Sequence, residues 1–210
     1  MNNIIPAIIG QNFKEVKEKI DLLEGHVLWA QLDIMDGKFV PPSTWQTAMD
    51  LKTITGQIKL EAHFMVDNPE EIIEDWIEVV DRIWIQIEAK GQPMETLRAI
   101  KETTVVEAGV SVEMQTDLEE LLPLIKELGL VQLMAIDKIG YQGHKFNQKV
   151  LERIKFLRQE CPDAIIQIDG GINQETAGLV LAAGASQLAV GSAIWQTEDP
   201  LHTLQQFQSL

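Results

Sequence analysis

The stretch Trp29-Ala-Gln-Leu-Asp-Ile-Met35 alternates polar and apolar side chains, whereas a strand buried on both faces is usually apolar throughout. Side chains two positions apart share one face of a strand, so Gln31, Asp33 and Met35 are expected to point to the same side. The residues between them are leucine and isoleucine, which suit a face covered by helices. The polar face of this strand is therefore predicted to point into a cavity.

Two later stretches follow the same arrangement. In Lys59-Leu-Glu-Ala-His-Phe-Met65 the polar residues Glu61 and His63 share one face, and Ile165-Ile-Gln-Ile-Asp-Gly-Gly171 places Asp169 beside a glycine pair. A buried charge is costly unless it is paired or bound to a metal. The two aspartates and the histidine, at the ends of three separate strands, are therefore predicted to form one site.

Strand-like stretches alternate with amphipathic segments along the whole chain, at intervals of roughly two dozen residues. The expected strands lie near residues 4–9, 27–34, 58–65, 82–88, 106–112, 130–136, 164–169 and 186–190. Regular alternation of this kind predicts an α/β fold with a parallel sheet. The count of eight favours closure into a (β/α)8 TIM barrel, as a single domain over residues 1–210.

An open, doubly wound sheet is the main alternative. Its usual signature is a glycine fingerprint after the first strand, but here Ile4–Ile9 is followed by Gly-Gln-Asn-Phe. The missing fingerprint favours the barrel.

Residues that start and stop helices divide the segments between the strands. Asn12, Asn68 and Asp117 precede amphipathic stretches and are predicted to cap helices at their amino ends. Gly129 and Gly184 lie where such stretches should end. These positions are consistent with one helix between successive strands.

Glycines gather in the loops after the last three expected strands. Gly140-Tyr-Gln-Gly-His-Lys145 follows the sixth strand, Gly170 and Gly171 follow the seventh, and Gly191 and Ser192 follow the eighth. In a barrel these loops form the rim that carries the chemistry. Glycine allows close approach to the backbone, and amide groups at a helix start can face an anion. The pattern favours a phosphate site made without positive side chains.

Composition limits the partners that the protein can attract. The chain has 32 acidic and 17 basic residues and a formal net charge of -15, so its field repels nucleic acid and anionic membrane surfaces. Cys161 is the only cysteine and cannot form an internal disulfide. Residues 1–6 lack the features of a signal peptide, and no apolar run reaches the ~20 residues that cross a bilayer. A cytoplasmic protein is expected.

The stretch Gln31-Leu-Asp-Ile-Met-Asp-Gly-Lys-Phe-Val-Pro41 resembles the ribulose-phosphate 3-epimerase family, as do Glu61–Met65, Ile168–Ile172 and Val190–Ile194. The resemblance runs in order from Pro6 to Trp195, and its most specific element is Asp-x-Met-Asp-Gly-x-Phe-Val-Pro. It implies a (β/α)8 barrel enzyme that moves a proton at carbon 3 of a ketopentose 5-phosphate with the help of a divalent metal.

Roles for particular residues follow from the resemblance by position. It implies that the metal, which would be zinc, iron, manganese or cobalt, is held by Gln31, Asp33, His63 and Asp169. Asp33 and Asp169 would be the proton-transferring acid and base. The residues expected to bind the substrate phosphate are Gly143, Gly170, Gly171, Gly191 and Ser192. Those expected to line the site are Ala7, Met35, Met65 and Met134.

The chemistry of epimerisation agrees with these roles. Removing a proton beside a ketone leaves an enediolate, whose negative charge a metal ion can stabilise as a Lewis acid. Inverting one carbon needs an acid and a base on opposite faces of the substrate, which two carboxylates on distant strands can supply.

The chain departs from the family at several of these positions. Gln31 replaces a histidine ligand, and an amide oxygen binds transition metals more weakly than imidazole does. Ala7 and Gly10 replace serines, Gln86 replaces the histidine of the fourth strand, and the loop Asp137–His144 is one residue longer. Changes in metal affinity and in recognition of sugar hydroxyls are expected.

Three functions remain open at the level of sequence. The first is a sugar-phosphate epimerase of the ribulose-phosphate kind. The second is a related isomerase or other enzyme acting on a different phosphorylated sugar, and the third is a non-catalytic sugar-phosphate-binding barrel without metal. In each case the expected partner is a small phosphorylated sugar, and a second copy of the chain is an open alternative.

Overall fold

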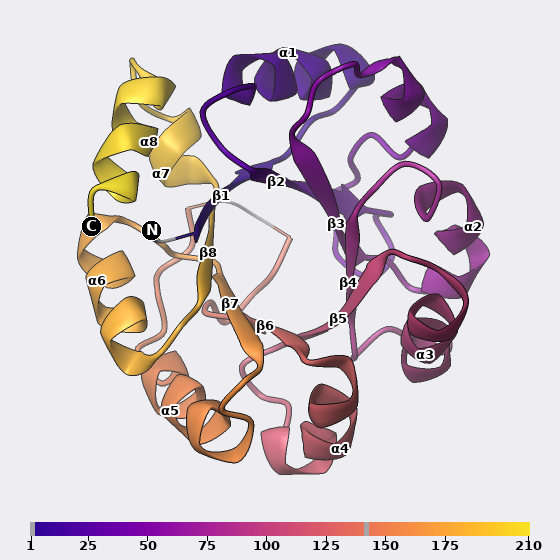
Figure 1. The fold of residues 1–210 in the computed structure, drawn as a ribbon, viewed down its shortest axis with the longest axis vertical. Coiled ribbons are helices and arrows are strands. Elements are labelled where there is room, and N and C mark those ends of the chain that lie inside the picture. The colour runs from indigo at the N-terminus through magenta and orange to yellow at the C-terminus, as the bar shows by residue number, and fades with distance from the viewer. Residues whose placement is uncertain (1–2, 141–142) are drawn as a thin grey trace.

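The computed structural model describes residues 3–140 and 143–210. Its eight strands are all parallel and close into a barrel in sequence order, with β8 paired to β1. Figure 1 looks down this barrel and shows the helices arranged around it. The predicted (β/α)8 TIM barrel is therefore confirmed, and the open sheet is excluded.

The strands lie where the sequence pattern predicts them. They are β1 (Asn3–Ile8), β2 (Trp29–Met35), β3 (Lys59–Met65), β4 (Arg82–Gln86), β5 (Glu107–Val112), β6 (Leu130–Met134), β7 (Ile165–Asp169) and β8 (Gln187–Val190). The α-helices are α1 (Phe13–Leu23), α2 (Ile73–Trp76), α3 (Pro93–Thr103), α4 (Leu118–Leu128), α5 (Val150–Glu160), α6 (Gln174–Ala183), α7 (Ser192–Trp195) and α8 (Pro200–Gln208). Two 3-10 helices, η1 (Ala48–Thr53) and η2 (Pro69–Glu71), complete the set. Within the described residues, no helix has both the length and the apolar character of a membrane span.

Most predicted helix ends are confirmed. The side chains of Asn12 and Asp117 accept hydrogen bonds from the first turns of α1 and α4. Gly129 and Gly184 end α4 and α6 with φ angles of 74° and 113°, a conformation that suits glycine. The predicted cap at Asn68 is wrong, because its side chain makes no capping hydrogen bond. There the chain forms the 3-10 turn η2 before the short helix α2 begins.

The outward faces of the strands form the main apolar core with the helices. Leu32, Ile34 and Phe64 are buried in this cluster, as the alternating pattern predicts. The ring of Trp76, on α2, meets the ring of Phe64 edge-on, with 5.4 Å between centroids. This apolar layer fixes which face of each strand points into the barrel.

The inward faces carry an unusual number of polar side chains. A TIM barrel interior is generally filled by layers of branched apolar residues. Here the strand residues that are both polar and buried are Gln31, Asp33, Glu61, His63, Arg82, Gln86, Ser111, Gln132, Gln167 and Gln187. The inner residues of β2, β3 and β7 thus form a polar column that reaches the rim.

One aromatic side chain in the barrel depends on a glycine in the next strand. Trp84 is fully buried, and it pairs in register with Gly109 of β5. A Cβ atom on Gly109 would lie 2.2 Å from the Trp84 ring, far inside van der Waals contact. The glycine therefore leaves the space that the indole occupies.

We expect Gly109→Ala to lower the free energy of unfolding by about 1–3 kcal/mol, because the added methyl group overpacks the barrel against Trp84. Gly178→Ala is the matched control, since Gly178 lies within α6 with no atom near its missing Cβ. That variant should be stabilised by up to about 1 kcal/mol, because alanine favours a helix. Urea denaturation measures both; equal effects would contradict the packing described.

Candidate active site

Two aspartates and a histidine meet near the carboxyl ends of three strands. Asp33 of β2 is paired in register with His63 of β3, and Asp169 is the last residue of β7. One ligand atom from each of the three lies within 4.8 Å of the others. We call Asp33 and Asp169 the site carboxylates. Residues more than a hundred positions apart in the chain are thus brought to one point.

His63 lies between the site carboxylates and is fully buried. Its Nδ1 atom is 3.4 Å from Oδ1 of Asp33 and 3.3 Å from Oδ2 of Asp169. Its Nε2 atom is 2.9 Å from the side-chain nitrogen of Gln86 and 3.3 Å from the hydroxyl of Ser111. Gln86 and Ser111 therefore support the ring from the side opposite the carboxylates.

Burial and neighbouring charges both shift the pKa values of Asp33 and His63. Burial raises the pKa of Asp33, and the negative charge of Asp169 acts in the same direction. Burial alone would lower the pKa of His63, but the carboxylates of Asp169 and Asp33 outweigh it and raise that pKa to about 9. Strongly shifted groups in a pocket are typical of catalytic sites.

The side chain of Gln31 connects the site carboxylates from below. Its amide nitrogen donates to Oδ1 of Asp33 and to Oδ2 of Asp169, in each case over 2.8 Å. Its amide oxygen accepts from the side-chain nitrogens of Gln132, at 2.7 Å, and Gln167, at 2.8 Å. The oxygen thus faces away from the carboxylates. Metal ligation by Gln31 stays a prediction, and it would require the amide to turn over.

The remaining donor set fits a divalent metal ion. It comprises one imidazole nitrogen and two carboxylate oxygens, a mixture that zinc, iron, manganese and cobalt all accept. The Nδ1 atom of His63 is buried and, apart from the two site carboxylates at 3.3 and 3.4 Å, has no polar partner within the described chain. Three protein ligands leave coordination positions for substrate oxygens.

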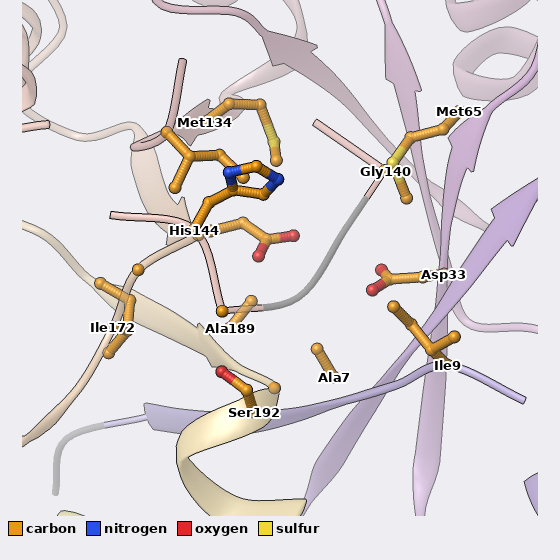
Figure 2. A pocket seen from close by; sticks show the side chains of 16 residues that line it. Ala7, Ile9, Asp33, Met65, Met134, Gly140, His144, Ile172, Ala189 and Ser192 are labelled. Atoms are coloured by element: carbon orange, nitrogen blue, oxygen red, sulfur yellow. The ribbon is translucent and has the colours of Figure 1, made fainter. Parts of the chain in front are cut away.

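A pocket opens above these groups at the rim of the barrel. Figure 2 shows Asp33 and Met65 facing it from one side, with Met134 and His144 on the other. The predicted residues that line this pocket are Ala7, Asp33, Met65, Met134, Gly143, Asp169, Gly170, Gly171, Gly191 and Ser192.

The other predicted residues lie close by. Gln31 and His63 form part of the buried layer beneath the pocket, and Met35 packs in the same small apolar cluster as Met65 and Met134. In the loop after β6, Tyr141 and Gln142 lie outside the described residues.

The glycine pair after β7 is required by close packing. Gly170 and Gly171 have φ angles of 99° and 68°, which side chains disfavour. A Cβ atom on Gly171 would lie 2.7 Å from the backbone of Phe146, and one on Gly170 would lie 2.9 Å from Ile136. The turn after β7 therefore packs directly against the loop after β6, and both line the pocket.

Two further residues, Gln132 and Gln167, shape the site, although neither is among those predicted from the sequence. Gln132 precedes Met134 by two positions, and Gln167 precedes Asp169 by two, so each shares the inward face of its strand. The alternation rule applied to β2 and β3 would have identified both. Their hydrogen bonds to Gln31 could not be predicted in the same way, because they form only when the strands close into a barrel.

The fold is a barrel whose strands bring a candidate reaction centre together at their carboxyl ends, where barrel enzymes carry their chemistry. A sequence profile described as the Ribulose-phosphate 3 epimerase family matches residues 3–195. The chain belongs to this family of isomerases, as its sequence resemblance predicts.

Individual relatives agree with the family assignment. The chain is 31% identical to a ribulose-phosphate 3-epimerase of Bacillus subtilis, covering 95% of this chain and 94% of the relative. It is 28% identical to the cytoplasmic isoform of Oryza sativa, covering 94% and 89%. A crystal structure of 3-hexulose-6-phosphate synthase superposes with a TM-score of 0.68 at 16% identity, covering 100% of this chain and 99% of that one. This last match shows the fold alone.

We expect Gln31→His to tighten Zn²⁺ binding by about tenfold or more, because an imidazole beside the site carboxylates adds a strong ligand. Titration against a competing chelator measures the affinity. Gln187→His is the control, since Gln187 is also buried in the barrel but contacts Arg82 instead of the carboxylates. An unchanged affinity in Gln31→His would show that position 31 does not reach the metal.

Proposed function

We propose that this protein is a sugar-phosphate epimerase that interconverts ketopentose 5-phosphates at carbon 3. The observation that carries the proposal is the convergence of Asp33 and Asp169, from β2 and β7, on one pocket at the rim of the barrel. The names of the relatives, ribulose-phosphate 3-epimerase, support the same reaction.

The site carboxylates would transfer the proton. One takes the hydrogen of carbon 3 and the other returns a proton to the opposite face, so that the configuration inverts. Because the reaction runs in both directions, each carboxylate serves as base in one direction and as acid in the other. Burial raises the pKa of Asp33, which makes its carboxyl group a better proton acceptor than an exposed aspartate. The amide of Gln31 holds both carboxylates in place.

Asp33, His63 and Asp169 would hold the divalent metal. When bound there, the metal supplies Lewis-acid stabilisation for the negative charge that develops on the substrate oxygens. Met65 and Met134 give the pocket walls that neither donate nor accept protons, and so they limit the access of water to the reacting carbon.

The phosphate group of the substrate would lie against the glycine turns. Gly170 and Gly171 expose backbone close to the pocket, and Gly191, Ser192 and Gly143 line its edge. Backbone amide groups bind phosphate through geometry instead of net charge. This suits a chain with a formal net charge of -15, which repels anions at long range.

A second candidate is an isomerase for a different phosphorylated sugar. Ala7 lines the pocket at a position where the family has a serine, so one hydroxyl that could bind the sugar is missing. A non-catalytic sugar-phosphate-binding barrel is the third candidate. For all three we propose action in the cytoplasm, where the named rice isoform is placed.

We expect the protein to exchange the carbon 3 hydrogen of ribulose 5-phosphate for deuterium in deuterated water when a divalent metal is present. Proton NMR follows both the exchange and the appearance of the carbon 3 epimer. Exchange with none of zinc, iron, manganese and cobalt would reject the first candidate and favour the other two.

Asp33→Asn and Asp169→Asn should each slow this exchange by at least about 100-fold, because an amide cannot accept or return the proton. Circular dichroism and the melting temperature show whether each variant folds. Asp117→Asn is the control, since it changes an aspartate that only caps α4, and it should exchange at the normal rate. Normal turnover in either site variant would contradict the assigned roles.

A further inference from the structure

We propose that Glu61 is a positioning residue that fixes the amide of Gln31 with its nitrogen toward the site carboxylates, and that this orientation weakens metal binding. The inference concerns the metal site of the proposed function and rests on it. The observations are a continuous chain of hydrogen bonds along the inside of the barrel, from Arg82 to the rim.

The series of hydrogen bonds starts at a buried ion pair. The guanidinium of Arg82 donates to Oε2 of Glu61 over 2.9 Å, and both side chains are almost fully buried. The same guanidinium also donates to Glu107, at the more exposed end, and to the oxygen of Gln187. Arginine only donates hydrogen bonds, so an oxygen of residue 61 must face it.

Gln167 links this pair to Gln31. One nitrogen, Nε2 of Gln167, lies 2.6 Å from Oε1 of Glu61 and 2.8 Å from Oε1 of Gln31. A carboxylate oxygen accepts hydrogen bonds, so Gln167 must present its nitrogen to Glu61. The same nitrogen then requires the oxygen of Gln31. The nitrogen of Gln31 is left to face the site carboxylates.

The carboxylates determine which end of each amide faces which neighbour. Nitrogen and oxygen of an amide are alike in size, and their orientation is inferred from their partners. Here the partners at both ends are carboxylates, Glu61 below and the site carboxylates above. The side-chain oxygens of Gln132 and Gln167 have no hydrogen-bond partner in the described chain, so they do not oppose a reversal. The nitrogen of Gln132 lies 3.4 Å from Oδ2 of Asp169, a long contact that opposes it weakly. Glu61, 2.6 Å from the nitrogen of Gln167, opposes it more strongly.

The orientation has a consequence for metal binding. The nitrogen of Gln31 partly satisfies Asp33 Oδ1 and Asp169 Oδ2, the carboxylate oxygens that lie 3.4 and 3.3 Å from Nδ1 of His63. It also brings N–H groups toward the position that a cation would occupy. A reversed amide would instead offer an oxygen ligand. The hydrogen bonds that residue 61 accepts, deep in the barrel, thereby set the metal affinity at the rim.

Glu61→Gln tests this coupling. Its new amide oxygen is expected to face Arg82 and its nitrogen to face Gln167, so Gln167 and Gln31 both turn over. We expect the dissociation constant for Mn²⁺ to fall by about tenfold or more. We also expect the metal-free variant to melt at a lower temperature, because an amide oxygen then faces two carboxylates. Electron paramagnetic resonance of free Mn²⁺ and thermal unfolding give the two readouts.

Two further variants distinguish an effect that passes from residue 61 through Gln31 from a general loss of the ion pair with Arg82. Glu107→Gln removes the other carboxylate from Arg82 without touching Gln167, and its Mn²⁺ affinity should stay within about twofold of the unmodified chain. Gln31→Met removes the amide that carries the effect. When Glu61→Gln is added to the Gln31→Met variant, the Mn²⁺ affinity and the melting temperature should change only slightly. Neither change should exceed the change that Glu107→Gln causes in the unmodified chain.

The outcomes are distinct. The proposal is supported if Glu61→Gln binds Mn²⁺ more tightly than the unmodified chain and if this gain is absent when Gln31→Met is also present. Unchanged or weaker Mn²⁺ binding in Glu61→Gln overturns it. If Glu61→Gln does not fold, Gln167→Met cuts the same link and should tighten binding in the same direction, and failure to do so overturns the proposal. If the unmodified chain binds no Mn²⁺, the proposed metal site fails. The melting temperatures of the metal-free variants then decide the inference, and equal values for Glu61→Gln and Glu107→Gln overturn it.

Discussion

The ion pair between Arg82 and Glu61 lies inside the barrel, with 2.9 Å between the two groups and almost no contact with solvent. Removing Arg82 would leave the carboxylate of Glu61 buried without a charged partner, which costs about 3–5 kcal/mol. The column of glutamines between this pair and the rim passes hydrogen bonds from one acidic group to the next.

The site at the rim is the upper end of this column. Asp33 and Asp169 receive the nitrogen of Gln31 from below, and His63 lies between them with support from Gln86. Gln31 is thus the group that holds the acid pair together. The polar interior and the site at the rim are therefore parts of one arrangement.

The fold was predictable because its signals are local. Each strand is only a few residues long, and the apolar face of each one is visible from alternation, as in Leu32 and Ile34. Helix caps at Asn12 and Asp117 depend on hydrogen bonds within one turn. Asn68 fails as a cap, because the chain after it forms a 3-10 turn and then one short helix, and its side chain makes no capping hydrogen bond.

The sequence by itself determined the eight strands, their inward faces and the residue types that face the cavity, because these follow from periodicities of two to four residues. Only the tertiary structure decided that Glu61, Gln167 and Gln31 form one chain of hydrogen bonds, and that the oxygen of Gln31 faces away from the site carboxylates. The physical reason is that the direction of a hydrogen bond depends on neighbours from distant strands, which become neighbours only when the barrel closes.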